Sequence, residues 1–167
     1  MSSHPWHFLL ESPLGPLGAR ADAQGRVTHL QFMDRNRLTL DCLGELQPHP
    51  AFRFLQRQVD AFFQGTCRTF NVPMAPVATA FQRRVWDALA EIPYGGTLAL
   101  DLLATRLGAE GPSVSQAVQE NPLVLLIPGH RIVDAHGQPI DRTGRQAGLL
   151  LGLEQGERHL SPLLANA

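Results

Sequence analysis

Residues Asn121 to Val133 read NPLVLLIPGHRIV, the most informative stretch of this chain. Leu123–Ile127 is an apolar run of the length of a buried strand, and Pro128-Gly129-His130-Arg131 follows at its end. A histidine and an arginine beside a core strand must be hydrogen-bonded or functional, because a buried polar group without a partner is costly. The stretch therefore predicts a buried strand that leads into a site.

Helices are predicted on both sides of this strand. The segments that read as helices are 81–92, 98–107, 112–119 and 146–155. Glycines at 108 and 111 break the chain between the second and third of them, which is the spacing of a helix-turn-helix. A plain helical hairpin produces the same spacing and is the commoner source of it.

The first third of the chain has the alternation of short strands and turns that is typical of a β-meander. Strands are predicted over Trp6–Glu11 and Val27–Met33, with turns rich in proline, glycine or aspartate over 12–18 and 22–25. A small antiparallel hairpin or meander therefore opens the chain.

An amphipathic helix is predicted from Pro50 to Gly65, and a loop over 66–80 follows it. The apolar residues of its stripe are Phe54, Leu55, Val59, Phe62 and Phe63. We therefore predict an α+β protein of two lobes. Residues 1–78 form an amino-terminal lobe of β-meander and helix, and residues 79–167 form a helical lobe that carries the helix-turn-helix and the PGHR strand.

The composition describes a globular chain with little electrostatic attraction for nucleic acid. Charged residues make up 17% of the 167 residues, the net charge is -1, and every basic residue is an arginine. Arginine can still make bidentate contacts to phosphates at a few fixed places. No apolar run is long enough to span a membrane, and the start lacks the pattern of a signal peptide, so a cytoplasmic protein is expected.

The two cysteines, Cys42 and Cys67, form neither a disulfide framework nor a thiolate metal site. They are predicted to be buried or free thiols. His4, His7 and His29 have no cysteine near them, so no metal is predicted, and no other cofactor is expected.

The NPLVLLIPGHRIV stretch resembles the active-site motif of the O6-alkylguanine-DNA alkyltransferases, NPxPxxIPCHRV, with Gly129 at the position of the cysteine. Further matches follow in order along the chain. They are Leu10–Gly15 to ESPLG, Phe81–Trp86 with Ile92–Gly95 to FQRxVWxxLxxIPYG, and Leu150–Glu154 to LLxxE. The resemblance implies a helix-turn-helix that binds the minor groove of double-stranded DNA, and a flipped guanine whose alkyl group passes to the cysteine sulfur.

The resemblance also implies that this chain cannot perform that transfer. Only a thiolate is nucleophilic enough, and Gly129 has no side chain. His130 and Glu154 match the histidine that activates the thiol through a water and the glutamate that orients it. Asn121 matches an asparagine that ties the recognition helix to the active-site strand. With no thiol to activate, these residues are expected to remain as structural anchors, and no catalytic residue is predicted.

Other positions depart from the family as well. Ala99 and Leu100 stand at the positions of its serine and tyrosine, Val114 is aligned with its arginine finger, and Arg142–Gln146 only approximates its YxGGL loop. The predicted DNA-binding positions are Ser113, Val114, Ser115, Gln116, Arg131 and Leu100. The predicted lesion pocket consists of Pro128, Gly129, Thr143, Gly144 and Arg145. Arginines that could replace the lost contacts are Arg83, Arg84, Arg106, Arg142 and Arg145.

Two functions of different class follow. The first is a monomeric, non-catalytic homologue that resembles the alkyltransferase-like proteins. It binds DNA, with O6-alkylguanine as the candidate target, and assists repair together with a repair-protein partner. The second is a degenerate regulatory or protein-interaction domain that no longer binds DNA. From residue 81 onward there are 7 arginines against 9 acidic residues, which favours the second function, whereas the retained scaffold favours the first. A third hypothesis is an enzyme that uses Cys42, Cys67 or other chemistry.

Overall fold

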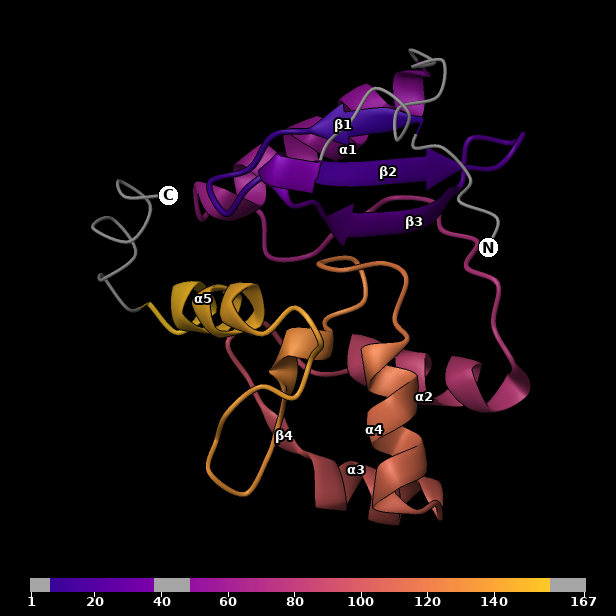
Figure 1. Cartoon of the computed structure of the whole chain (residues 1–167), viewed down its shortest axis with the longest axis vertical. Helices are drawn as coiled ribbons and strands as arrows, with labels where there is room; N and C mark the ends of the chain where they lie inside the picture. The colour runs from indigo at the N-terminus through magenta and orange to yellow at the C-terminus, as the bar shows by residue number, and fades with distance from the viewer. Residues whose placement is uncertain (1–6, 38–48, 157–167) are drawn as a thin grey trace. The chain divides into compact units, whose positions relative to one another are not determined.

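The computed structural model describes residues 7–37 and 49–156. The chain divides into two compact units, with the division between Val77 and Ala78. Figure 1 shows the strands β1 to β3 and the helix α1 in the first unit, and the helices α2 to α5 in the second. This mixture of a small antiparallel sheet and helices confirms the predicted α+β class. Trp6, His4 and Cys42 lie outside the described residues.

The sheet of the first unit has the strand order β1-β2-β3. The strands are β1 (Phe8–Leu10), β2 (Leu17–Ala21) and β3 (Val27–Phe32). Both pairings are antiparallel, with Leu10 opposite Leu17 and Leu17 opposite Phe32. The predicted meander is confirmed, but the turn predicted over 12–18 is too long because Leu17 and Gly18 already belong to β2.

Helix α1 (Pro50–Phe63) packs one face into the core of the first unit. Its N-cap is His49, whose Nδ1 accepts a hydrogen bond from the backbone N of Ala51 at 3.1 Å. The buried residues of the helix are Phe52, Leu55, Val59 and Phe62. Phe54, predicted to lie on the buried stripe, is 44% exposed, and Phe52 takes that place by stacking on Phe8 at 5.1 Å between ring centroids. A single-turn helix η1 (Arg35–Arg37) follows β3.

The second unit begins with α2 (Ala80–Ala90), which starts in a capping box between Thr79 and Gln82. Helices α3 (Leu100–Leu107) and α4 (Gly111–Gln119) follow, separated by three residues. Gly108 ends α3 in the left-handed conformation, with φ 62°, which a glycine adopts without strain. The indole Nε1 of Trp86 donates to the carbonyl of Ala117 at 2.9 Å and fixes α4 against α2.

Two short parallel strands, β4 (Leu98–Ala99) and β5 (Ile132–Val133), bring the regions before α3 and after the PGHR motif together. Helix α3 therefore begins two residues later than the helix predicted over 98–107, because Leu98 and Ala99 pair with β5. The single-turn helix η3 (Gly129–Arg131) precedes β5, and α5 (Arg145–Glu154) closes the unit. Among the described residues, no helix is long and apolar enough to cross a bilayer.

The strand predicted over Leu123–Ile127 does not form, and this prediction is wrong. The run is a buried turn in which Ile127 N donates to Leu123 O at 2.9 Å and Leu125 adopts φ 68°. A second hydrogen bond inside the run joins Leu126 N to Val124 O at 2.8 Å, so the backbone folds back on itself rather than extending as a strand. Periodicity does not separate a short apolar strand from another buried segment, which explains the error.

Candidate functional site

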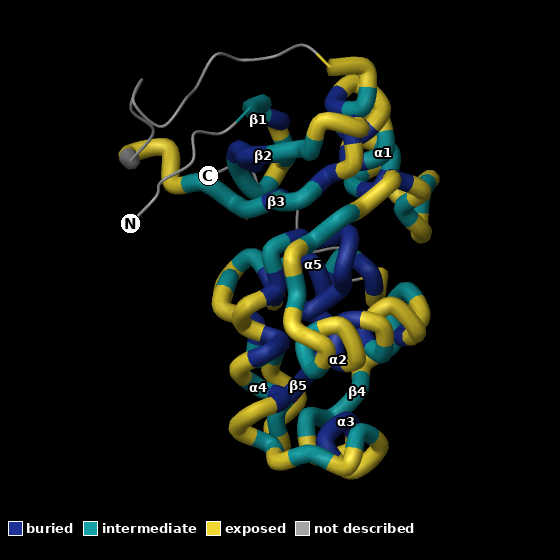
Figure 2. Tube along the Cα trace, turned by 90° about the vertical axis from the view of Figure 1, so that its right-hand side faces the viewer, coloured by how far each residue is buried: buried dark blue, intermediate teal, exposed yellow. Residues whose placement is uncertain are grey.

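The segment 121–133 lies almost wholly in the core of the second unit, and only residue 122 is not classed as buried. Figure 2 shows dark blue, buried tube between α5 and the other helices of this unit. Asn121 clamps the turn, since its Oδ1 accepts from Leu123 N at 2.9 Å and its Nδ2 donates to Ile127 O at 2.7 Å. Both bonds lie within residues 121–127, and they fix where the chain enters Gly129 and His130.

A buried ionic network then links η3 to α5. His130 Nε2 lies 2.9 Å from Glu154 Oε1, so the structure brings together the two residues that the sequence paired. Arg131 also binds this carboxylate, with Nη2 at 2.6 Å from Oε1 and Nε at 2.9 Å from Oε2. The remaining contacts of the network go to backbone groups, with Arg131 Nη1 donating to Ile92 O at 2.6 Å and Gly95 N donating to Glu154 Oε2 at 3.3 Å.

The network holds Glu154 in its ionised form. Burial disfavours the charged carboxyl, but the hydrogen bonds and positive charge of His130 and Arg131 outweigh that effect and lower the pKa of Glu154 from 4.5 to about 2. An ionised carboxylate can only accept, so the ring nitrogen Nε2 of His130 carries the proton. The Glu154 side chain is 0% exposed. The arrangement is a satisfied buried cluster that anchors η3 to the closing helix.

Arg131 was predicted to contact DNA, and its burial corrects that prediction. Only 8% of the residue is exposed, and its guanidinium is bound to Glu154 and Ile92 and lies 5.9 Å from the centroid of the Tyr94 ring. Moving it to a phosphate would leave the buried Glu154 without its partner.

Gly129 faces a carboxylate. A Cβ placed on Gly129 would stand 2.5 Å from Asp141 Oδ2 and 3.4 Å from Asn121 Nδ2. Such a distance to Oδ2 is shorter than real Cβ contacts, so Asp141 occupies the place of any side chain at this position. Asp141 is itself only 8% exposed, and its Oδ1 accepts from Thr143 N at 2.8 Å.

Sequence reasoning did not select Asp141. It lies directly before Arg142, the first residue of the stretch that the resemblance matches to the pocket loop of the family, and this position was the one available signal. An acidic residue next to charged neighbours in a polar loop ordinarily indicates a solvated surface. Only the packing of this loop against η3 shows that the carboxylate is buried.

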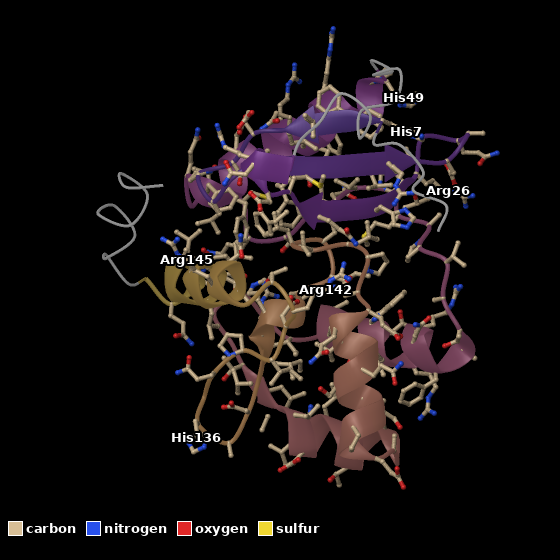
Figure 3. All side chains as sticks on the ribbon, viewed as in Figure 1. His7, Arg26, His49, His136, Arg142 and Arg145 are labelled. Carbon is tan, nitrogen blue, oxygen red and sulfur yellow. The ribbon has the colours of Figure 1, made fainter. Side chains whose placement is uncertain are left out.

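The other predicted pocket residues divide between the core and the surface. Pro128 and Gly129 are buried, Thr143 is half-buried, and Gly144 and Arg145 are exposed. Gly144 adopts φ 55° immediately before α5. Figure 3 labels Arg142 and Arg145, both of which are exposed where the chain leads into α5. Through Asp141, the structure brings the start of this loop to Gly129.

Helix α4 exposes fewer of the predicted DNA contacts than expected. Val114 is 0% exposed and faces the core, so it cannot be the position of an inserted finger, and that prediction is wrong. Ser113 and Gln116 are exposed, while Ser115, like Leu100 at the start of α3, is intermediate. The helical period turns every third or fourth residue inward, which the assignment of Val114 to the DNA face ignored.

One acidic residue lies at the end of the exposed face of α4. Glu120 accepts from Gln116 Nε2 at 2.8 Å and from Gln82 Nε2 at 2.6 Å. The two hydrogen bonds, led by that from Gln116, lower the pKa of Glu120. Gln116 is therefore held toward a carboxylate, and no arginine lies within α4.

The arginines proposed as substitutes are scattered over the unit. Arg84 Nη2 donates to Leu107 O at 2.9 Å, and Arg84 and Arg106 line a pocket of about 590 Å³ between α2 and α3 together with Asp87 and Glu91. Two positive and two negative side chains leave this pocket without a net charge. It does not include Gly129 or Asp141.

The described thiol, Cys67, and the described histidines do not form a second chemical site. Cys67 Sγ donates to Thr69 O at 3.1 Å in the first unit. Within residues 7–37 and 49–156, no group of three or more His, Cys, Asp or Glu side chains is arranged to hold a metal ion. His7 Nδ1 accepts from Ala21 N at 3.3 Å, and His29 Nδ1 lies 3.0 Å from the Thr28 hydroxyl.

Comparison with known proteins matches these features to one family. Residues 80–160 match the model of the 6-O-methylguanine DNA methyltransferase DNA-binding domain. A methylated-DNA–protein-cysteine methyltransferase of Methanosarcina acetivorans is 34% identical over 148 residues, covering 86% of this chain and 91% of the relative. The chain belongs to the methylated-DNA–protein-cysteine methyltransferase family. The Mycobacterium leprae member of this family is 36% identical over 137 residues, covering 81% of this chain and 82% of the relative.

Solved structures of this methyltransferase family share the fold. The crystal structure of Mycobacterium tuberculosis OGT in complex with DNA matches with a TM-score of 0.75 and 30% identity, covering 95% of this chain and 98% of that one. The M. tuberculosis O6-methylguanine methyltransferase itself matches with a TM-score of 0.76 and 29% identity, covering 94% and 96%. Membership of the methyltransferase family is therefore supported along nearly the whole length of the chain.

Proposed function

We propose that this protein is a non-catalytic member of the methyltransferase family that binds double-stranded DNA, recognises O6-alkylguanine and assists repair without accepting the alkyl group. The observation that carries the proposal is Gly129, which stands in the PGHR motif where the family motif has its cysteine, and which packs against Asp141. We further propose that the protein acts in the cytoplasm as a monomer and passes the marked site to a repair-protein partner.

The chemistry of alkyl transfer supports this proposal. Attack on the saturated carbon of an O6-alkyl group requires a thiolate or an equally strong nucleophile. Gly129 supplies none, and the buried pair of His130 and Glu154 has no thiol beside it to activate. The carboxylate of the pair also binds Arg131 and the backbone N of Gly95, which is the behaviour of a structural anchor.

The case for DNA binding rests on the scaffold. The α3–α4 pair, separated by three residues, has the spacing of a helix-turn-helix, and a relative of 30% identity has been solved in complex with DNA. Ser113 and Gln116 expose hydrogen-bonding groups on α4, and Arg142 and Arg145 expose guanidinium groups before α5. Because the second unit carries more acidic than basic residues, we expect these arginines to make its contacts to phosphates.

Competition binding tests the proposal directly. A labelled duplex with one O6-methylguanine is displaced by unlabelled duplexes that carry either O6-methylguanine or guanine at the same position. We expect the modified duplex to compete at least tenfold better, and log affinity to fall linearly with log salt as phosphate contacts are released. Equal and weak competition at low salt contradicts lesion recognition.

The absence of alkyl transfer needs its own measurement. The intact mass of the protein after incubation with excess O6-methylguanine duplex should be unchanged, whereas a catalytic relative should gain one methyl group. A stable gain of mass, mapped to Cys67 or to any other residue, contradicts the non-catalytic assignment.

One observation favours the second candidate function, a protein-interaction domain without DNA binding. Glu120, held by Gln82 and Gln116, presents negative charge at the end of α4. An apolar docking patch would support this function further, but none accompanies the charge in the part of this unit that the structure describes. Leu102, at 56% exposure, is the one large apolar side chain exposed among the described residues of the second unit. Absence of DNA binding at every salt concentration would favour this function.

A further inference from the structure

Asp141 places a carboxylate oxygen where a side chain at residue 129 would begin. Its Oδ2 stands 2.5 Å from the position of a Gly129 Cβ, and the residue is 8% exposed. This oxygen is therefore the group that an alkyl substituent meets if a flipped base is presented to residue 129. Gly129 has no left-handed φ that would require glycine, so the missing side chain leaves room that Asp141 fills.

The two oxygens of Asp141 differ in their surroundings. Oδ1 accepts from Thr143 N at 2.8 Å, a contact that shapes the start of the loop. Among residues 7–37 and 49–156, no donor makes a hydrogen bond to Oδ2. The nearest polar groups are committed elsewhere, because Asn121 Nδ2 donates to Ile127 and both His130 and Arg131 bind Glu154.

A carboxylate oxygen that accepts no protein hydrogen bond, on a residue that is 8% exposed, discriminates among the groups that approach it. A hydroxyl or ammonium group gains a charge-assisted hydrogen bond there. A methyl group gains no such bond and desolvates the oxygen further, while a second carboxylate is repelled. This carboxylate oxygen therefore favours a hydroxyl or ammonium group over a methyl group, whereas an apolar pocket would favour the methyl group.

We propose that Asp141 is a specificity-determining residue that makes this site prefer O6-alkylguanines whose alkyl group ends in a hydrogen-bond donor or a cation. The ligand class is O6-(2-hydroxyethyl)guanine and O6-(2-aminoethyl)guanine in duplex DNA, ahead of O6-methylguanine, with O6-carboxymethylguanine bound least. This inference rests on the proposed function, since it requires that the alkyl group of a flipped base reach residue 129.

The test uses the full chain and five duplexes of one sequence. They carry guanine, O6-methylguanine, O6-(2-hydroxyethyl)guanine, O6-(2-aminoethyl)guanine or O6-carboxymethylguanine at one position. We expect the aminoethyl and hydroxyethyl duplexes to bind on the order of tenfold more tightly than the methyl duplex. The carboxymethyl duplex should bind more weakly than the methyl duplex.

Two variants separate the charge of Asp141 from its shape. Asp141→Asn keeps the size of the side chain and an oxygen for Thr143 N, but it removes the negative charge. We expect it to lose most of the aminoethyl advantage and to bind the carboxymethyl duplex as well as the methyl duplex. The control is Asp134→Asn, because Asp134 also accepts backbone hydrogen bonds, from His136 at 2.8 Å and Gln138 at 3.0 Å, in the preceding turn. Asp134→Asn should leave the ranking unchanged.

The outcomes distinguish this inference from the proposed function. If all four modified duplexes bind equally and more tightly than guanine, lesion recognition stands and the role of Asp141 is wrong. If none binds more tightly than guanine, both fail. If Asp141→Asn does not fold, as judged by circular dichroism, the ranking of the parent protein still decides, because a methyl preference overturns the inference.

Discussion

The guanidinium of Arg131 and the carboxylate of Glu154 meet at 2.6 Å in the core of the second unit, and the His130 ring binds the same carboxylate from the neighbouring position. The contact spans 23 residues of sequence and connects η3 with the last turn of α5. Several charge-assisted hydrogen bonds therefore meet on one buried carboxylate, and we expect this network to stabilise the folded protein. Its removal should affect folding before it affects ligand binding.

Replacement of Glu154 by alanine should strongly destabilise the protein. Arg131 and His130 would remain buried without their shared acceptor, and breaking such a pair costs about 3–5 kcal/mol. Urea unfolding measures the change in the free energy of unfolding. The matched control is Glu11→Gln, which breaks an exposed ion pair with Arg35 and should have little measurable effect. Equal effects of the two substitutions would show that the buried network is not a stabilising element.

The stability of the protein should fall on acidification, with a contribution from Glu154. Its pKa is about 2 in the folded protein and 4.5 ordinarily, so the unfolded chain binds this proton first. The contribution is therefore complete above about pH 4.5 and is lost as the pH falls from there toward 2. Melting temperatures of the parent and of Glu154→Gln should converge over this interval. A constant difference between the two across it would contradict the assigned shift.

Introducing a cysteine at Gly129 should by itself give only slow alkyl transfer. Its Cβ would displace Asp141 Oδ2, and the neighbouring carboxylate would raise the pKa of the new thiol. The double variant Gly129→Cys with Asp141→Ala should transfer a methyl group from O6-methylguanine DNA on the order of tenfold faster than the single variant, because one unit of thiol pKa changes the thiolate fraction by that factor. Intact-mass measurements over time give both rates, and equal rates would show that Asp141 does not block the position.

Removal of the charge of Glu120 should strengthen DNA binding. Glu120 lies at the end of α4, and a carboxylate near phosphates weakens association at low salt. We expect Glu120→Gln to bind duplex DNA a few-fold more tightly at low salt, with the difference shrinking as salt rises. Glu91→Gln, at the end of α2, is the control for overall charge. If both variants gain equally, α4 is not the surface that faces DNA.

The described helices and the meander followed from local patterns in the sequence. The helix predicted over 81–92 corresponds to α2, and the glycine at 108 marked the end of α3, because apolar periodicity and left-handed turns depend on residues close together in the chain. The pairing of His130 with Glu154 came from the resemblance to the family rather than from any spacing. Family membership was likewise visible from ordered motifs.

Long-range packing decided what local patterns did not. The apolar run 123–127 forms a turn whose two ends are both hydrogen-bonded to the Asn121 side chain. Val114 is buried because α4 packs on α2 and α3. Arg131 is buried because its guanidinium binds the carboxylate of Glu154, 23 residues away in the sequence.

By itself, the sequence determined the approximate positions of the helices and the meander, the family, and the glycine at 129 in the PGHR motif, since each depends on neighbouring residues or on ordered motifs. Only the tertiary structure decided that Asp141 occupies the vacant place and that the His130 and Arg131 side chains share one buried carboxylate. The physical reason is that burial and charge pairing depend on which distant segments meet, and periodicity carries no information about that.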